Sequence, residues 1–312
     1  MKRPSPYSCL NSLPPLKKAI SYFDTVRVFI PFHLSKSQQE TLKSLDRSMH
    51  YMAMEKIGRK GVSCNFRARA YRYVAALTFQ RLSQELVQLV QGMFRGGPPP
   101  LVSKAHIALD LTAATKCDAE LVQEIIELGF LKRGHRIDHS INKYRNTRYY
   151  GHRGDRNVVA IYSDKPCRIG GDPCCHFEIR LQGRQALHEQ GLTTLEDLLA
   201  FNPRAFWAKR LCLIELRNDA LELIGEALYR RGPRRQIFRN RNETRQRWRI
   251  NAGVFLRWVA AREGSYPYPT ATALEATLRR FGLPPLRRFG KSVDVSGLLP
   301  MELTFKSVLS YQ

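Results

Sequence analysis

Two stretches of the chain decide the fold: residues 157–162 (NVVAIY) and residues 175–181 (CHFEIRL). Apolar residues fill the first stretch, and apolar and polar residues alternate in the second half of the other, as in β-strands. Between the two stretches lie Gly170, Gly171 and Pro173, which are typical of turns. Short strands separated by turns of this kind predict an antiparallel sheet.

Further strand and helix patterns precede this pair. Strands are predicted at residues 24–31 (DTVRVFIP), 71–79, 104–112 (KAHIALDLT) and 147–151. Helices are predicted at residues 35–48, with Ser35 or Ser37 as N-cap, from Ser83 to the loop at 96–100 (GGPPP), and from Asp118 to about Gly129.

From about residue 193 the sequence becomes helical. Thr193 and Glu196 have the spacing of a capping box, as do Thr272 and Glu275. Helices are predicted at residues 206–231, 243–263 and 272–280. These patterns predict an α+β protein in three parts: a flexible basic arm (1–20), an antiparallel sheet packed with helices (21–192), and a basic helical domain (193–312).

The composition points to a polyanionic partner. The 312 residues include 51 Lys and Arg against 27 Asp and Glu, which gives a formal net charge of +24. Nucleic acid is the commonest partner for such an excess. A hydrophobic fraction of 43% can build a core, which disfavours a disordered basic tail protein. No transmembrane run or signal-peptide pattern is present, so we expect no membrane association. Seven scattered cysteines indicate a reducing, cytoplasmic setting.

The positive charge is concentrated in two clusters. Nine arginines and a single acid, Glu243, lie between residues 230 and 249. These arginines are Arg230, Arg231, Arg234, Arg235, Arg239, Arg241, Arg245, Arg247 and Arg249. The second cluster surrounds the Tyr-rich strand and includes Arg148, Arg153 and Arg156. Arginine favours bidentate phosphate contacts, so both clusters are predicted to bind nucleic acid. A solvated charged face is the alternative interpretation.

Alternation along the strands places candidate metal ligands on one face. Residues two apart on a strand point the same way, so His106 shares a face with Asp110, and His176 and Glu178 share one with Arg180. If these strands pair, one face gathers an Asp, a Glu and up to two His. Hard oxygen ligands suit Mg²⁺ or Mn²⁺, so Asp110, Glu178 and His176 are the candidate ligands. Alternatively, Asp110 caps a strand end and Glu178 pairs with an arginine.

Tyr162 ends its strand and is the candidate nucleophile. A tyrosine hydroxyl has an unperturbed pKa of about 10, so it needs help from a metal and from a cation such as Lys165. Tyr149 and Tyr150 are rival nucleophiles, and all three tyrosines are alternatively structural strand residues.

Other motifs carry less weight. Cys167, Cys174, Cys175 and His176 form C-x6-C-C-H, a spacing unlike that of usual zinc sites. Walker A, G-x-G-x-x-G and G-x-S-x-G patterns are absent from the sequence. ATP-driven, dinucleotide and serine-hydrolase chemistries therefore have no support.

The order of these segments resembles that of rolling-circle replication initiators, especially those of filamentous phages. Residues 106–110 (HIALD) resemble the family's strand that ends in Asp. Residues 159–165 (VAIYSDK) resemble its V-A-Y-L-K segment, and residues 176–181 (HFEIRL) resemble its R-F-E-A-R-I strand. Residues 149–153 (YYGHR) are similar to its Y-x-G-S-R segment, and residues 24–32 to its first strand.

The resemblance covers about residues 22–192 and implies a nuclease core that cuts and rejoins one DNA strand at a replication origin, in the cytoplasm of a bacterial host. Tyr162 would become linked to the 5′ phosphate and free a 3′ hydroxyl, and host helicase and polymerase would be partners. A divalent ion on Asp110 and Glu178 would stabilise charge on the phosphate, assisted by Lys165 and Arg180. The alternatives are a non-enzymatic sequence-specific DNA-binding protein, such as a repressor or origin-melting protein, and an RNA-binding protein. The sequence leaves the oligomeric state open.

Overall fold

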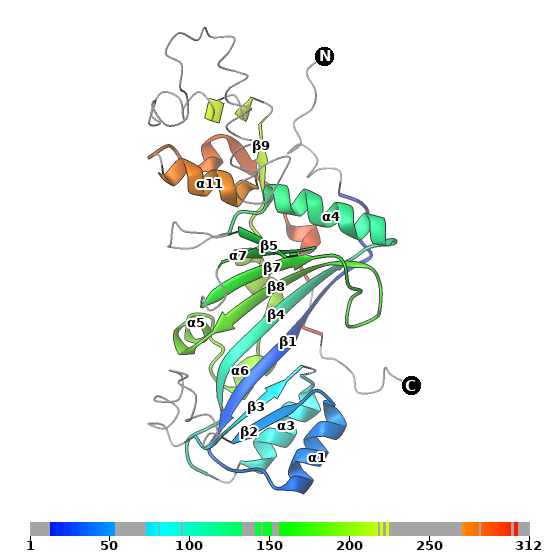
Figure 1. Cartoon of the computed structure of the whole chain (residues 1–312), viewed down its shortest axis with the longest axis vertical. Helices are drawn as coiled ribbons and strands as arrows, with labels where there is room; N and C mark the ends of the chain where they lie inside the picture. Colours follow the sequence, from blue (N-terminus) through cyan, green and yellow to red (C-terminus); the bar gives the residue numbers. More distant parts are fainter. Residues whose placement is uncertain are drawn as a thin grey trace.

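The computed structural model describes residues 13–53, 73–80, 82–94, 96–132, 141–144, 146–151, 156–217, 219–220, 223–224, 270–280, 282–300 and 303–304. Its centre is an eight-stranded antiparallel sheet in the order β2-β3-β1-β4-β8-β7-β6-β5 (Figure 1). The strands are β1 (Lys18–Ile30), β2 (His50–Ala53), β3 (Ala75–Phe79), β4 (Leu101–Thr112), β5 (Ile141–Tyr144), β6 (Thr147–Tyr150), β7 (Asn157–Tyr162) and β8 (Cys174–Gln182). Together with the helices described below, the sheet confirms the predicted α+β class.

The long strands β1 and β4 run through the middle of the sheet, and two irregularities shape them. On β1 the register shifts between Phe23 and Thr25, so Asp24 is the extra residue of a bulge. On β4 a second shift leaves Ser103 without a partner on β1. Because a one-residue insertion inverts the side-chain alternation, Asp24 and Thr25 lie on the same face of the sheet.

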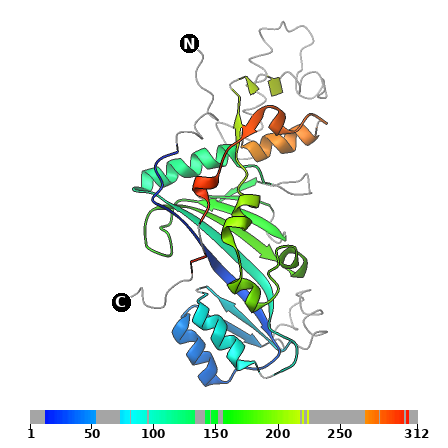
Figure 2. The same cartoon turned by 180° about the vertical axis from the view of Figure 1, so that it is seen from behind.

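One face of the sheet, the inner face, carries the core. The helices that pack on it are α4 (Lys116–Gly129), α6 (Leu195–Leu199) and α7 (Pro203–Arg210). Figure 2 shows the yellow-green α6 and α7 across the back of the sheet. Trp207 of α7 packs edge-on against Phe177 and donates a hydrogen bond from Nε1 to Ser21 Oγ at 2.9 Å. The opposite, outer face carries most of the polar side chains that the sequence singled out.

Two further helices cover the inner face at the β2–β3 end. They are α1 (Lys36–Leu45) and α3 (Gln84–Met93), and Leu42 and Leu86 from these helices join the common core. Ser35 caps α1 in a capping box with Gln38, and Ser83 caps α3. Both helices, and Ser35 as the cap of α1, confirm the prediction.

The remaining elements follow the sheet in sequence. They are α5 (Arg184–His188), β9 (Ile214–Leu216), α11 (Ala271–Arg280), η3 (Leu286–Arg288), β10 (Gly290–Ser292) and η4 (Ser296–Leu298), with β9 and β10 forming a two-stranded sheet. The described part of the chain contains no helix long and apolar enough to span a bilayer.

The predicted helix at residues 206–231 is wrong. The helix α7 stops at Arg210, and Ile214 begins the strand β9. Four consecutive residues, 211–214, are buried, which a helix with a single apolar stripe cannot achieve. The helix predicted at residues 243–263 lies outside the described residues.

Both predicted capping boxes are misplaced. The cap of α6 is Thr194 with Asp197, one residue beyond the predicted pair. At α11 the side chain of Thr270 accepts a hydrogen bond from the Ala273 amide. Thr272 instead joins α11 to the end of α4, because its hydroxyl donates to the Phe130 carbonyl and accepts from the Lys132 amide.

The described elements cross both predicted domain boundaries, the one at residue 20 and the one at residue 193. Residues 1–12 of the predicted arm lie outside the described residues, and β1 already begins at Lys18. Beyond residue 193, the Leu213 backbone bridges to Phe130, and the Thr193 carbonyl accepts from the Val102 amide. The separate helical domain stays a prediction, but its described segments share the core of the sheet.

Candidate metal and tyrosine site

The strand register collects polar side chains on the outer face. Ala108 of β4 lies opposite Glu178 of β8, Asp110 lies opposite His176, and His106 lies opposite Arg180. On the other side of β8, Tyr162 of β7 lies opposite His176 and Ala160 lies opposite Glu178. The predicted pairing of the Asp-bearing and Glu-bearing strands is therefore present, and Tyr162 lies on the neighbouring strand.

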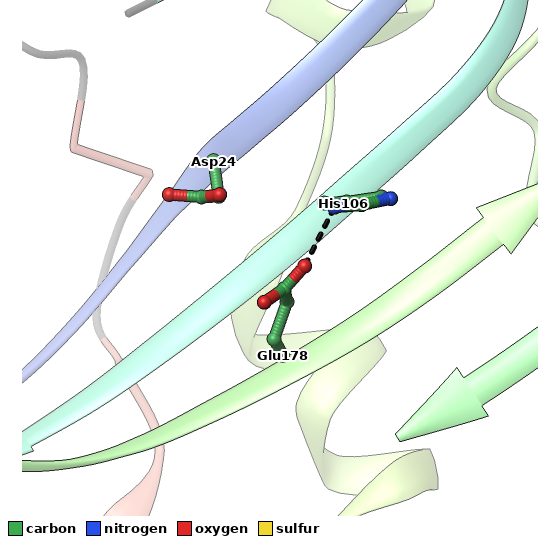
Figure 3. A group of neighbouring side chains, drawn as sticks. All are labelled: Asp24, His106 and Glu178. Atoms are coloured by element: carbon green, nitrogen blue, oxygen red, sulfur yellow. Dashed lines mark ion pairs between the residues drawn. The ribbon is translucent and has the colours of Figure 1, made fainter. Parts of the chain in front are cut away.

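Asp24, His106 and Glu178 form a candidate metal centre (Figure 3). One potential ligand atom from each lies within 4.8 Å of the others, and all three residues are buried. His106 Nδ1 lies 2.6 Å from Glu178 Oε1. Two carboxylates and an imidazole are donors that Mn²⁺ accepts, and two carboxylates also suit Mg²⁺.

The electrostatics of this trio favour the protonation states that a cation requires. Burial alone would raise the pKa of Glu178, but hydrogen bonds from His106, His176 and Arg180 outweigh it and hold the pKa well below its usual value. Burial lowers the pKa of His106, against the opposing influence of Glu178. At neutral pH the group therefore offers a carboxylate and a neutral imidazole.

Two arginines compensate the negative charge of the trio. Arg168, on the β7–β8 connection, donates from Nη1 to Asp24 Oδ1 at 2.6 Å. Arg180 donates to both carboxylate oxygens of Glu178, at 2.9 and 3.2 Å. A guanidinium on each carboxylate therefore offsets part of the negative charge of the trio.

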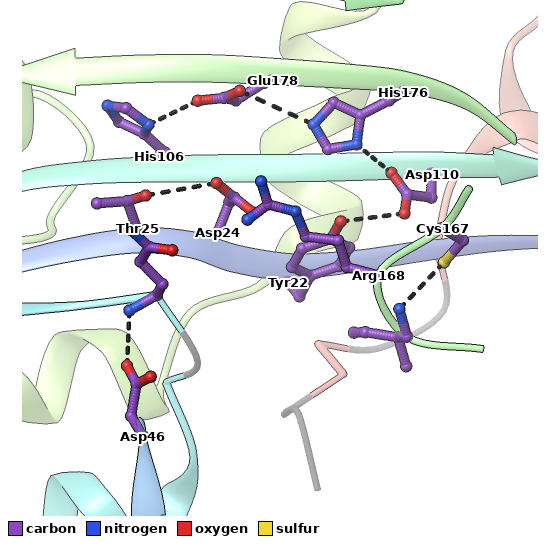
Figure 4. A network of polar contacts seen from close by, with 12 residues as sticks. Tyr22, Asp24, Thr25, Asp46, His106, Asp110, Cys167, Arg168, His176 and Glu178 are labelled. Carbon is purple, nitrogen blue, oxygen red and sulfur yellow. Dashed lines mark hydrogen bonds and ion pairs between the residues drawn. The ribbon is translucent and has the colours of Figure 1, made fainter. Parts of the chain in front are cut away.

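Asp110 and His176 contact each other and lie beside the trio (Figure 4). His176 Nδ1 contacts Asp110 Oδ1, and the Tyr22 hydroxyl donates to Asp110 Oδ2 at 3.0 Å. Burial alone would lower the pKa of His176, but the charge of Asp110 and the hydrogen bonds outweigh it and raise the pKa to about 9. Of the three predicted ligands, only Glu178 belongs to the trio, since Asp110 has its oxygens directed at His176 and Tyr22.

Sequence reasoning missed Asp24 and Arg168. The sequence pattern puts Asp24 at the start of a strand and gives it no role. Its side chain reaches the outer face only because of the bulge in β1. One signal was available: the apolar alternation passes from odd positions at Phe23 to even positions at Val26 and Val28, which marks an inserted residue. For Arg168, a loop residue, the sequence carries no such signal.

Tyr162 borders the trio on the outer face. Its ring packs against the ring of His176 with centroids 4.3 Å apart, and its residue surface is only 8% exposed. Burial, together with the charges of Glu178 and Asp24, raises the pKa of its hydroxyl, while Arg168 opposes the rise. Lys165 Nζ lies 5.6 Å from the centre of the ring. The predicted Tyr, Lys and Glu thus lie together.

The two rival tyrosines lie on opposite faces of the sheet. Tyr150 lies on the inner face, where it is fully buried and packs edge-on against Phe130. Tyr149 lies on the outer face, with the Arg180 guanidinium 5.4 Å from its ring centre. Of these two tyrosines, only Tyr149 shares the outer face with Tyr162.

The predicted nucleic-acid contacts have different outcomes. Arg148 is 5% exposed on the inner face, and its Nε donates to Glu127 Oε2 of α4 at 2.6 Å. Its prediction as a DNA contact is wrong, because Thr147–Tyr150 alternates and turns Arg148 into the core. Arg156 is exposed. The other predicted contacts lie outside the described residues: Arg153, Arg230, Arg231, Arg234, Arg235, Arg239, Arg241, Arg245 and Arg247.

Comparisons with known proteins do not assign this chain to a family. No family model matches the chain, and no curated protein matches it. Among solved structures, it is similar to the rolling circle replication initiator protein from Geobacillus stearothermophilus, with 11% identity and a TM-score of 0.30 over 85% of this chain and 97% of that one.

Proposed function

We propose that this chain is a rolling-circle DNA replication initiator. It would act as a metal-dependent, site-specific single-strand endonuclease and strand-transferase through a covalent phosphotyrosine link to the 5′ end at the origin. The observation that carries the proposal is the Asp24–His106–Glu178 trio beside Tyr162 on one face of the sheet. The net charge of +24 supports a nucleic-acid substrate.

The residues fit a divalent cation, with Mn²⁺ or Mg²⁺ as the candidates. Asp24, His106 and Glu178 would hold it, and the imidazole among them favours Mn²⁺. When bound, the ion would stabilise charge on a phosphate and offset the negative charge that now opposes ionisation of Tyr162.

The chain's own residues account for the covalent step. The Tyr162 oxygen loses its proton to solvent and bonds to phosphorus, while the bond from phosphorus to the 3′ oxygen breaks. The 3′ oxygen takes a proton from solvent and leaves as a hydroxyl, and the 5′ phosphate stays on Tyr162. Lys165, 5.6 Å from the ring centre, would counter charge near the phosphate. Reversal of the same step would rejoin a strand.

The wider role is also a proposal. The arginines at residues 230–247 would dock the origin duplex, and the freed 3′ end would be extended by the host polymerase behind a host helicase. A cytoplasmic location in a bacterial host goes with these partners.

The test is nicking of supercoiled plasmid DNA carrying a library of inserts. We expect nicks that require Mn²⁺ or Mg²⁺ and disappear in Tyr162→Phe. Tyr149→Phe is the matched control, because it removes the hydroxyl of the rival tyrosine on the outer face and should keep nicking. Mass spectrometry of the digested adduct should locate the nucleotide on Tyr162.

Two results would contradict the proposal. An adduct of normal yield in Tyr162→Phe would move the nucleophile to another tyrosine. Specific DNA binding with no nicking in either metal would instead indicate the runner-up function, a non-enzymatic DNA-binding protein.

A further inference from the structure

A second polar row crosses the outer face next to the metal trio. Gln182, Lys104, Arg27, Thr78 and His50 are successive cross-strand neighbours on β8, β4, β1, β3 and β2. All five are polar, and two are permanent cations. Since directly paired residues share a face, this row lies on the same side of the sheet as His106 and Glu178.

Two cations stand opposite each other in this row without an acid between them. Arg27 and Lys104 are direct cross-strand partners. Arg27 Nε donates to Thr78 Oγ1 at 3.2 Å, and the Lys104 ammonium has no hydrogen bond or ion pair within the described part of the chain. Like charges placed directly opposite destabilise a sheet, so this pair has a cost in the free protein.

The nearby acids are already engaged. Asp24 accepts from Arg168, and Glu178 accepts from Arg180 and His106. The backbone also holds the pair in place, because the bulge residue Ser103 donates from Oγ to the Arg27 carbonyl at 3.2 Å. Arg27 and Lys104 are therefore presented together, half-buried and without a carboxylate in direct contact among the described residues.

The row lies one step from the metal trio. Lys104 is two residues before His106 on β4, and Arg27 is two residues after Thr25 on β1, so the two rows are about 7 Å apart. An extended single strand on this face would bring one phosphate to the trio and a neighbouring phosphate to the pair.

We propose that Arg27 and Lys104 form a phosphate subsite that binds a backbone phosphodiester of single-stranded DNA next to the phosphate at the metal trio. The location relative to a scissile phosphate rests on the proposed function, but the phosphodiester binding does not. The bound single-stranded DNA would then run across β4 and β1 toward β3 and β2.

The test measures binding in the full chain carrying Tyr162→Phe, so that no cleavage intervenes. Lys104→Gln and Arg27→Gln remove one charge each, and Lys116→Gln is the matched control. Lys116 is exposed on α4 and reaches only Glu120, at 3.8 Å, among the described residues. The probes are fluorescein-labelled oligodeoxythymidine and oligouridine of equal length, titrated by anisotropy over a range of salt concentrations.

We expect Lys104→Gln and Arg27→Gln each to weaken binding of oligodeoxythymidine several-fold. Each should flatten the plot of log affinity against log salt by about 0.7, the value for one lost contact to a single strand. Lys116→Gln should leave the slope unchanged. Thermal midpoints of the two variants should stay equal or rise, because a like-charge pair is relieved, which separates lost binding from lost folding.

An unchanged slope in both variants, an equal loss in Lys116→Gln, or no binding of oligodeoxythymidine would overturn the subsite. A loss confined to oligouridine would overturn the assignment to DNA. The nicking assay is independent: the expected slopes without nicking would leave the subsite standing and defeat the proposed function, whereas nicking with unchanged slopes would defeat the subsite alone.

Discussion

At the scale of single residues, the pairing of His176 with Asp110 sets the charge at the centre of the site. The neighbouring carboxylate holds His176 protonated up to a pKa of about 9. The imidazole of His176 packs against the ring of Tyr162 and is already protonated at neutral pH, so it cannot act as a general base there.

This pairing predicts a pH dependence of stability. The pKa of the imidazole is about 6.5 in the unfolded chain and about 9 in the folded protein, so the folded state binds the extra proton. The contribution to the free energy of unfolding is fully present below pH 6.5 and is lost as pH rises through about 9. Urea unfolding in EDTA across this window should show a decline that His176→Gln removes. Parallel curves for the two proteins would contradict the shift.

Arg148 is buried in the core and not exposed on a DNA-binding surface, which leads to a second prediction. Arg148→Met leaves the carboxylate of Glu127 buried with a lost partner, and should reduce the free energy of unfolding by about 3 kcal/mol. The exposed Arg156→Met should cost less than about 0.5 kcal/mol. Urea unfolding of both variants is the measurement, and equal stabilities would refute the buried ion pair.

At the scale of elements, the capping of α6 shows how one residue of register matters. Asp197 accepts hydrogen bonds from the Thr193 amide, the Thr193 hydroxyl and the Thr194 amide, at 2.7 to 2.8 Å. Its neighbour Glu196 accepts from Gln91 at the helix surface.

Replacing Asp197 should therefore lower the free energy of unfolding more than replacing Glu196. We expect Asp197→Ala to reduce the free energy of unfolding by about 1 to 2 kcal/mol, as for lost caps, and Glu196→Ala by less. Chemical denaturation measures the difference. The reverse order would favour the capping box at Thr193 and Glu196 that the sequence pattern indicates.

At the scale of the whole molecule, segments far apart in sequence form one core. Trp207 of α7 is buried against Phe177 and bonded to Ser21, which joins the segment after residue 193 to β1 and β8. Thr304 adds a link, since its amide donates to the Ser21 carbonyl at 2.8 Å. The sheet and its covering helices therefore form one packed unit with a shared core in the described part of the chain.

This unit predicts a single unfolding transition. Trp207→Ala should lower the stability of the sheet and the helices together, by about 3 to 5 kcal/mol, because it opens a large cavity in the shared core. Lys209→Ala, on the exposed side of α7, is the control. Circular dichroism and hydrogen exchange of β8 should move in parallel. Loss of helical signal with full protection of β8 would instead indicate two independent parts.

Local pattern determined much of this protein. The apolar run NVVAIY and the alternation in CHFEIRL are enough to predict β7 and β8, and Ser35, one of two candidate N-caps, marks the start of α1, because these features depend on neighbours within a few residues. The shared face of His106 with Asp110, and of His176 with Glu178, follows from the same two-residue period. The net charge of +24 alone indicates a polyanionic partner.

Tertiary structure decided which of these residues meet. The register between β1, β4 and β8, and the bulge at Asp24, arise from pairing between segments more than sixty residues apart, which no local period encodes. That pairing brings Asp24 and His106 to Glu178 as candidate metal ligands, while Asp110 pairs with His176. Arg148 turns inward through the alternation along β6. It also sets Lys104 against Arg27, where two cations separated in the sequence become one site on the sheet.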